Sequence, residues 1–219
     1  MRKNRCSNPV LIFLLLAFLL SWPFLLYGFG WFGRKEDILM RYLFSSSGML
    51  MISLAAFLTR AIWERKDFHD VGWKPGHLRW YFAIFLLCAF LWLGPPVIAL
   101  LVGNLSWNQN ITSDELIVVI LSLGGLCLLA GFGEEFGWRG YLIPRWLSEP
   151  RYARLTLLAI GVIWGAWHCA IVIGPLLRSA ISDTVSWSTA IFPFLLSSIQ
   201  IIGASIVPSL IFGAIWILQ

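Results

Sequence analysis

Charged side chains are scarce in this chain. Asp, Glu, Lys and Arg make up 12% of its 219 residues, whereas 59% are hydrophobic, and the mean hydropathy is +0.80. A soluble domain carries about 25% charged residues, so this composition excludes an ordinary soluble enzyme and favours a polytopic membrane protein. The scarcity also makes each ionised group in an apolar run informative, because a charge at membrane depth is costly and usually functional.

Cysteine and histidine are few as well. The four cysteines show neither metal-ligand spacing nor a disulfide framework, and His168 is the only histidine inside an apolar run. Basic residues exceed acidic ones by 16 to 11, but they collect in short segments between apolar runs rather than in one patch. This distribution follows the positive-inside rule, so we expect no nucleic acid partner.

Six apolar runs are each near the ~20 residues that a helix needs to cross a bilayer. We therefore predict an all-α fold, a polytopic transmembrane helical bundle of about six spans that lies in the lipid bilayer. The prolines of the third span are expected to kink or interrupt it, and the long sixth span to be tilted or broken. The predicted spans are Pro9–Phe29, Ile38–Leu58, Trp80–Val102, Leu116–Ile143, Leu155–Leu177 and Ala190–Leu218.

The distribution of Lys and Arg predicts the orientation of these spans. Twelve of the sixteen basic residues fall on the side that holds the N-terminus if all six runs cross the membrane. Because cytoplasmic loops carry the excess of basic residues, both termini are expected to be cytoplasmic.

Two carboxylates and a guanidinium directly follow the uncharged run from Leu116 to Phe132. They lie in the segment Gly133-Glu134-Glu135-Phe136-Gly137-Trp138-Arg139-Gly140-Tyr141-Leu142. Glu135 and Arg139 are four residues apart, so they can pair along one face of a helix. Glu134 then remains as the carboxylate without an intrahelical partner.

Glu134 and His168 are predicted to lie at a similar depth. Glu134 precedes Arg145 by 11 residues, about 16 Å along a helix, and His168 follows Arg154 by 14 residues, about 21 Å. If these two spans are antiparallel neighbours, the two groups lie within about 5 Å of the same depth. A carboxylate and an imidazole placed in this way can bind a metal or polarise a water molecule for attack on a carbonyl.

Each of these residues also has a purely structural interpretation. Glu135 and Arg139 can form a buried ion pair that fixes helix packing, Glu134 can bond a loop at the membrane edge, and His168 can bond a neighbouring helix. The glycines of this region permit close helix approach and also weaken the local helix; they are Gly131, Gly133, Gly137 and Gly140.

Residues 134–142 resemble the first motif of the CAAX prenyl protease and bacteriocin-processing family, EExxxR followed by glycine, an aromatic residue and leucine. The segment Trp164-Gly165-Ala166-Trp167-His168 resembles its second motif, in which three residues separate an aromatic residue from a histidine. Val71-Gly72-Trp73-Lys74-Pro75 also resembles the short cytosolic segment ahead of the family's core.

The resemblance implies an intramembrane, metalloprotease-like endopeptidase of the type II CAAX class, in a bacterial cytoplasmic membrane. Its substrates would be prenylated C-terminal peptides or leader-bearing peptides. Glu134 would activate a water molecule, while Glu135 and Arg139 would brace the site. His168 would stabilise the oxyanion or, with Glu134, hold a divalent metal such as zinc.

One family feature has no counterpart in this sequence. The third motif is a histidine followed four positions later by Asn or Asp, and no histidine follows His168. We therefore expect one membrane domain, residues 1–219, whose family-like core at about 116–219 is truncated at its C-terminus.

Two functions stay open on these residues. One is the endopeptidase, and the other is a non-catalytic membrane protein of the same family, such as a bacteriocin immunity protein or a scaffold. The second would keep the Glu–Arg–His cluster for packing or partner binding. A transporter that uses Glu134 as a proton site is a weaker third interpretation, because the sequence has no symmetric pair of broken helices.

Overall fold

The computed structural model describes residues 8–31, 38–67, 77–103, 124–126, 128–146, 153–182 and 186–217. Within these residues the regular secondary structure is helical and contains no strand, which confirms the predicted all-α class. Residue contacts divide the chain into two units. The first unit consists of Met1–Val71 and Leu123–Gln219, and the second of Gly72–Ser122.

Four helical stretches in the described part of the chain are long and apolar enough to cross a membrane. They are Pro9–Trp31, Leu39–Glu64, Arg154–Ile181 and Ser188–Ile211, and they correspond to the first, second, fifth and sixth predicted spans. The third predicted span corresponds to helix α3, Leu78–Leu101, in the second unit. The fourth lies partly outside the described residues, which show helix at 128–146.

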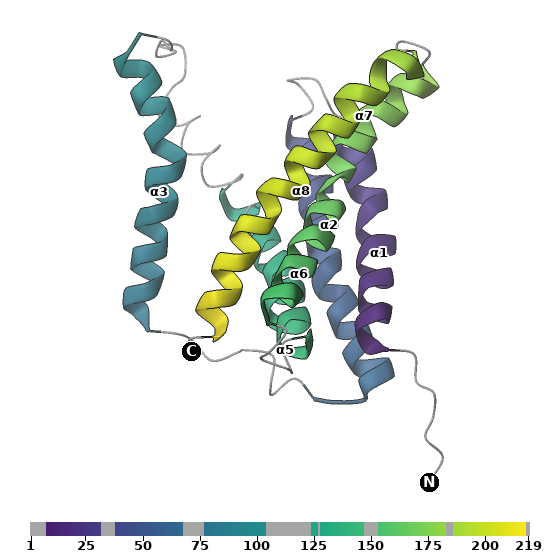
Figure 1. Cartoon of the computed structure of the whole chain (residues 1–219), viewed down its shortest axis with the longest axis vertical. Coiled ribbons are helices and arrows are strands. Elements are labelled where there is room, and N and C mark those ends of the chain that lie inside the picture. Colours follow the sequence, from purple (N-terminus) through teal and green to yellow (C-terminus); the bar gives the residue numbers. More distant parts are fainter. Residues whose placement is uncertain are drawn as a thin grey trace. The chain divides into compact units, whose positions relative to one another are not determined.

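The first unit is a bundle in which helices pack pairwise (Figure 1). Helix α1 packs against α2 and α7, and α6 packs against α8. Two π-helical segments, η2 and η3, continue regular helices and contact the neighbouring elements. The elements of this unit are α1 (Pro9–Trp31), α2 (Ile38–Leu58), η2 (Thr59–Glu64), η3 (Phe136–Leu142), α5 (Ile143–Trp146), α6 (Ala153–His168), α7 (Ala170–Ile181) and α8 (Trp187–Ile217).

The prolines interrupt neither α3 nor α8. Helix α3 continues through Pro95 and Pro96, and α8 is one helix of 31 residues that contains Pro193 and Pro208. Of the two alternatives predicted for the sixth span, tilted or broken, the break is therefore wrong. At ~1.5 Å per residue α8 is about 46 Å long, more than the ~30 Å hydrocarbon core, and a helix of this length fits by tilting. Figure 1 shows α8 running obliquely to α1 and α2.

The fifth predicted span is divided where no proline stands. Helix α6 ends at His168 and α7 begins at Ala170, with a turn at Cys169 between them. Cys169 is buried, and its thiol lies 3.5 Å from the carbonyl oxygen of Gly165. The division places His168 at the last residue of α6, beside the turn that leads into α7.

Small residues let α6 approach α8 closely. A Cβ atom on Gly165 would lie 2.6 Å from the Cα of Ile202, and one on Gly161 would lie 2.8 Å from the Cα of Ile206. These two glycines are four residues apart, the spacing by which small residues bring transmembrane helices into contact. At these two positions the backbone of α6 thus lies so close to α8 that even a methyl side chain has no room.

An aromatic core joins α1, η3 and α6. The ring of Phe13 lies 5.6 Å from that of Trp138 and 4.8 Å from that of Tyr141. Trp138 in turn contacts Trp167, with 6.2 Å between ring centroids, and all four side chains are almost fully buried. These contacts fix η3 between α1 and α6, which are the elements around the candidate site.

We expect Gly165→Ala to lower the unfolding temperature of the detergent-solubilised protein. The added methyl group would press on the α8 backbone, and overpacking of this kind costs about 1–3 kcal/mol. Gly203→Ala is the matched control, because a Cβ atom on Gly203 has no neighbour within 4 Å. Equal melting of the two variants would contradict the close α6–α8 contact.

Candidate functional site

The segment 128–135 is fixed against α2 immediately before Glu134. The hydroxyl of Ser53 donates a hydrogen bond of 2.6 Å to the carbonyl oxygen of Gly133. A Cβ atom on Gly133 would lie 3.0 Å from the Cα of Leu50, so glycine is what permits this approach. Gly137 also lies against α2, whereas a Cβ atom on Gly131 would meet open space. The predicted close approach is thus confirmed at Gly133 and Gly137 and wrong at Gly131.

The helix widens into a π-helix directly after the two glutamates. Segment η3 spans Phe136–Leu142, and the amide of Ile143 donates to the carbonyl of Trp138, five residues earlier. π-helical turns are rare and frequently occur at functional sites. The glycine-rich segment therefore stays helical, and its departure from the α-helix is a change of pitch rather than an unwound loop.

Glu134 is buried in the protein, with 4% of its surface exposed. Its Oε1 atom accepts a hydrogen bond of 2.5 Å from the indole nitrogen of Trp164 on α6. The same oxygen lies 3.9 Å from Nε2 of His168. The sequence predicted that the carboxylate and the imidazole lie at matched depth, and the structure confirms that they face each other.

His168 is held in one tautomer by the backbone. Its Nδ1 atom lies 2.9 Å from the carbonyl oxygen of Trp164. A carbonyl oxygen can only accept a hydrogen bond, so Nδ1 must carry the proton. In the neutral ring Nε2 therefore presents a lone pair, and this is the nitrogen that faces Glu134.

Helix α1 holds the end of α6 from the other side. Trp22 donates from its indole nitrogen to the carbonyl oxygen of Trp167, 3.2 Å away. The indole nitrogen of Trp167 donates to the hydroxyl of Ser21 at 2.6 Å. The rings of Trp164 and Trp167 lie edge-on to the imidazole, with centroid distances of 5.0 and 4.8 Å. His168 is thus enclosed by aromatic rings whose own positions are fixed by hydrogen bonds.

The predicted pair of Glu135 and Arg139 forms, with 3.0 Å between Oε1 and Nη1. Its setting is less buried than expected, because the Glu135 side chain is 44% exposed and that of Arg139 14%. The guanidinium also lies over the ring of Trp164, 4.1 Å from its centroid. All four predicted site residues therefore cluster around Trp164.

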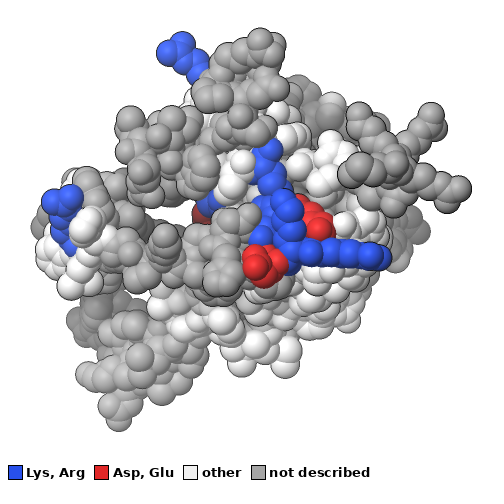
Figure 2. All heavy atoms as spheres, turned by 90° about the horizontal axis from the view of Figure 1, so that it is seen from below, with Lys and Arg blue, Asp and Glu red and all other residues white. Residues whose placement is uncertain are grey.

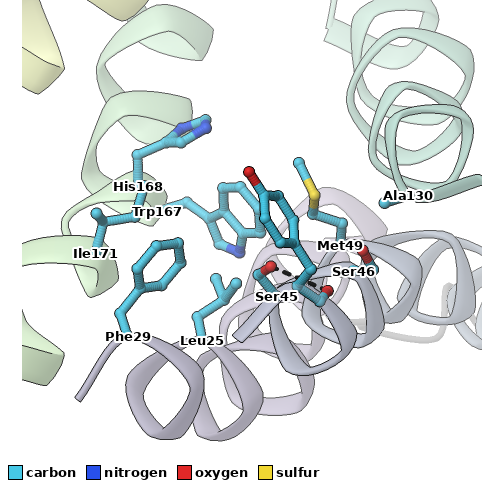
Figure 3. A pocket seen from close by; sticks show the side chains of 10 residues that line it. Leu25, Phe29, Ser45, Ser46, Met49, Ala130, Trp167, His168 and Ile171 are labelled. Atoms are coloured by element: carbon cyan, nitrogen blue, oxygen red, sulfur yellow. Dashed lines mark hydrogen bonds between the residues drawn. The ribbon is translucent and has the colours of Figure 1, made fainter. Parts of the chain in front are cut away.

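A pocket of about 210 Å³ lies beside His168 (Figure 3). Its walls come from α1, α2, the segment 128–135, and the junction of α6 and α7, and they are mainly apolar, with Phe29, Met49 and Trp167 among the lining residues. Ser45 and Ser46 add hydroxyl groups on the α2 side. The imidazole therefore stands at the boundary between a polar cluster and an apolar pocket.

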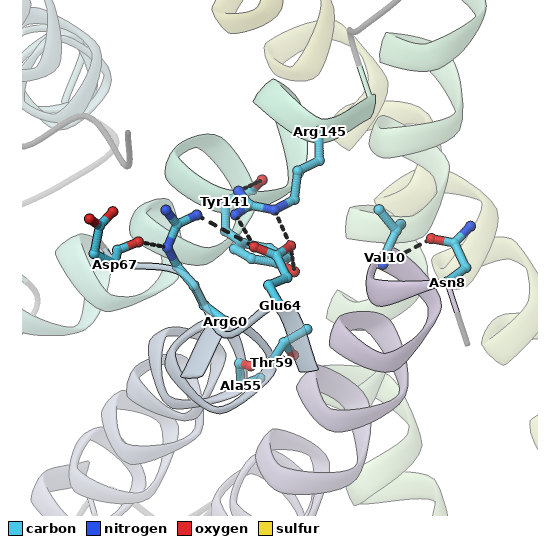
Figure 4. A network of polar contacts seen from close by, with 9 residues as sticks. All are labelled: Asn8, Val10, Ala55, Thr59, Arg60, Glu64, Asp67, Tyr141 and Arg145. Atoms are coloured by element: carbon cyan, nitrogen blue, oxygen red, sulfur yellow. Dashed lines mark hydrogen bonds and ion pairs between the residues drawn. The ribbon is translucent and has the colours of Figure 1, made fainter. Parts of the chain in front are cut away.

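A second polar cluster, which the sequence interpretation missed, joins η2 to η3 and α5 (Figure 4). Glu64 accepts hydrogen bonds from the hydroxyl of Tyr141 at 2.7 Å and from Nε and Nη2 of Arg145 at 2.5 and 2.6 Å. The guanidinium of Arg145 also lies 3.8 Å from the ring centroid of Tyr141. A signal was present for one member only, since Tyr141 belongs to the first motif, whereas Glu64 lies beyond the end of the predicted span Ile38–Leu58.

The described residues offer two metal ligands at the site rather than three. They contain no group of three or more His, Cys, Asp or Glu side chains placed to hold a metal ion. Glu134 and His168 supply one oxygen and one nitrogen that face each other. Catalytic zinc sites use three protein ligands, so within this part of the chain the donor set is one ligand short.

Comparison with known proteins gives one match. Residues 116–218 match the family model described as type II CAAX prenyl endopeptidase Rce1-like. A search of curated proteins and a search of solved structures each found no match. The matched segment contains η3, α6, α7 and α8, and therefore every residue of the cluster around Trp164.

We expect Trp164→Phe to destabilise the protein by at least about 1.5–3 kcal/mol, because it removes a hydrogen bond to a charged group and replaces the indole by a smaller phenyl ring. Thermal unfolding in detergent measures the effect. Trp63→Phe is the control, since Trp63 is 42% exposed. If both variants melt like the unsubstituted protein, the bond from Trp164 to Glu134 contributes nothing to stability.

Proposed function

Because residues 116–218 of this chain belong to the Rce1-like family of type II CAAX prenyl endopeptidases, we propose that the protein is an intramembrane endopeptidase in which Glu134 activates water. The family is a protease family, and the long apolar helices make the chain an integral membrane protein. The observation that carries the proposal is a carboxylate, 4% exposed, that faces an imidazole nitrogen 3.9 Å away.

A water molecule between these two atoms would be oriented for attack. Oε1 of Glu134 and the unprotonated Nε2 of His168 are both acceptors, so a water that bridges them donates both of its hydrogens. At hydrogen-bond distances of about 2.8 Å, a separation of 3.9 Å corresponds to an angle of about 90° at the water oxygen. The lone pairs of that oxygen then point away from both residues, toward a substrate carbonyl.

The proposed reaction is a general-base hydrolysis. The water oxygen bonds to the carbonyl carbon as Glu134 takes its proton, and the carbonyl π electrons move to the oxygen. When this tetrahedral intermediate collapses, the carbon–nitrogen bond breaks and the leaving amine takes the proton from Glu134. A positioned carboxylate of this kind contributes about 10²–10⁴-fold to the rate.

Trp164 links the remaining predicted residues to this chemistry. Its indole nitrogen orients Glu134, its carbonyl sets the tautomer of His168, and its ring lies under the guanidinium of Arg139. We assign Arg139 and Glu135 the role of positioning residues, because they act on the reacting groups through Trp164. Substitution of either one would misplace Glu134 without removing it.

A divalent metal such as zinc fits this arrangement only in part. Glu134 and His168 would be its ligands, and a bound metal would polarise the substrate carbonyl as a Lewis acid. The described residues lack the third protein ligand of a catalytic zinc site, so we derive the reaction from the side chains alone.

The proposed substrates are peptides or proteins, cleaved after prenylation near the C-terminus or within a leader segment. The apolar pocket beside His168 is suited to a hydrophobic part of such a substrate. We propose a bacterial cytoplasmic membrane with the N-terminus in the cytoplasm, from the distribution of basic residues and the family.

We expect Glu134→Gln and His168→Ala each to lower hydrolysis of responsive peptides at least about 100-fold, since each removes one acceptor from the proposed water. The assay uses purified protein with a panel of prenylated and leader-type peptides. Gln at position 134 can still accept the bond from Trp164, so this variant should melt like the unsubstituted protein. His77→Ala, a change at an exposed histidine, is the control and should keep full activity.

The alternative is a non-catalytic family member, such as an immunity protein or a scaffold. Absence of hydrolysis by folded, unsubstituted protein across the panel would favour it. Hydrolysis that survives Glu134→Gln would instead reject Glu134 as the base while leaving the protease assignment intact.

We expect hydrolysis to persist in the presence of EDTA, because two ligands hold zinc weakly and the proposed base is a side chain. The measurement compares initial rates after incubation with the chelator and after addition of excess zinc. Loss of activity that only zinc restores would show that the pair holds a metal, and would replace the general-base step proposed above.

A further inference from the structure

A second pocket, of about 500 Å³, lies at one end of the first unit, where α1 begins and η2 and α5 end. Pro9, Val10 and Pro144 form its apolar wall, and Glu64, Lys66 and Arg145 line the rest together with Asn8. It is separate from the cluster around Trp164, and none of its residues has a part in the proposed hydrolysis.

The pocket lies at the depth of the membrane surface. Helix α1 has 23 residues and is therefore about 34 Å long, slightly more than the ~30 Å hydrocarbon core. Asn8 and Pro9 stand at its first turn, and Glu64 ends the span that runs antiparallel to it. A pocket at these helix ends lies in the headgroup region, where lipid phosphates are found.

The charge of this end is positive. Glu64 is already bonded by Tyr141 and twice by Arg145, so its negative charge is neutralised within the protein. Lys66 is exposed at the pocket and brings a further positive charge. The pocket itself is lined by Glu64, Lys66 and Arg145, and Arg60 also lies within hydrogen-bond distance of Glu64. Arg65 and Asp67 are the exposed neighbours of Lys66 in the sequence. Figure 2 shows Lys and Arg side chains crossing this face with acidic groups between them.

Two details favour the binding of a phosphate group in this pocket over a general electrostatic attraction of anions to the whole face. The pocket has room for a headgroup, and its apolar wall can contact the glycerol and upper acyl region of a lipid. Asn8 caps α1 by accepting from the amide of Val10 at 3.1 Å, which places the positive end of the helix dipole at the pocket rim. A helix start alone would not define a site, but here it adds to Lys66 and to a pocket of about 500 Å³.

We propose that this pocket binds a phosphate group, with Lys66 as the residue that contacts it directly. The same chemistry is offered by the phosphodiester of an anionic lipid and by free inorganic phosphate. The position at the membrane surface favours the lipid. The proposal does not depend on whether Glu134 catalyses hydrolysis.

Native mass spectrometry of the full chain tests the proposal with phosphatidylglycerol and phosphatidylcholine added to separate samples. We expect retention of phosphatidylglycerol over phosphatidylcholine, and about a fivefold loss of that retention in Lys66→Gln, since one basic residue at a membrane surface contributes about 1 kcal/mol. Arg154→Gln is the matched control. It removes one exposed positive charge at the start of α6 but does not line the pocket.

The arms of the experiment separate the two phosphate sources. Competition by millimolar inorganic phosphate against bound phosphatidylglycerol would support a shared phosphate site, whereas thermal stabilisation by inorganic phosphate without lipid retention would assign the pocket to the free ion. Equal losses in Lys66→Gln and Arg154→Gln would overturn the proposal, because the attraction would then belong to the whole face. No preference between the two lipids and no response to inorganic phosphate would also overturn it.

Discussion

Polar groups inside a helical membrane bundle must be satisfied by other parts of the protein, because the hydrocarbon core supplies no water to bond them. This chain meets the requirement at Glu134, whose hydrogen-bond donor stands on another helix. The same arrangement recurs at Glu64, near one end of the bundle, where the donors also stand on other elements. Glu134 is bonded by Trp164 on α6, and Glu64 by Tyr141 and Arg145. Each carboxylate therefore ties helices together, and its burial is compatible with folding only while those helices stay in place.

The close helix contacts and the polar contacts support each other. Gly133 brings the glutamate segment onto α2, and Gly161 and Gly165 bring α6 onto α8. Helix α1 then holds the end of α6 through Trp22 and Ser21. The carbonyl of Trp167 that accepts from Trp22 lies next to His168, just before the division of the fifth span. The position of the His168 imidazole therefore depends on α1 and α8 as well as on α6, the helix that carries it.

The sequence predicted those features that depend on distance along a helix. Matched depth of Glu134 and His168 requires only the rise per residue and two loop positions, and the pair of Glu135 and Arg139 requires only their spacing. The contacts of Trp164 and the cluster at Glu64 depend on how each helix is rotated about its axis. The almost evenly apolar helices give little information on rotation, and η2 and η3 shift it further. For α8 the sequence left open whether the span is tilted or broken, because a proline can either interrupt a helix or be accommodated within it.

The π-helical segment η3 separates the two carboxylate centres along the chain, with Glu134 just before it and Tyr141 near its end. A π-helical turn takes up one more residue than an α-helical turn, and each residue of an α-helix turns the chain by about 100°. The faces of the chain that carry Glu134 and Tyr141 are therefore rotated by about a quarter turn relative to each other, compared with their positions on a regular α-helix. Insertion or deletion of a single residue between them therefore acts as a rotation: when Glu134 faces α6, Tyr141 no longer faces η2. The length of this segment is a constraint of its own, separate from the identity of any side chain within it.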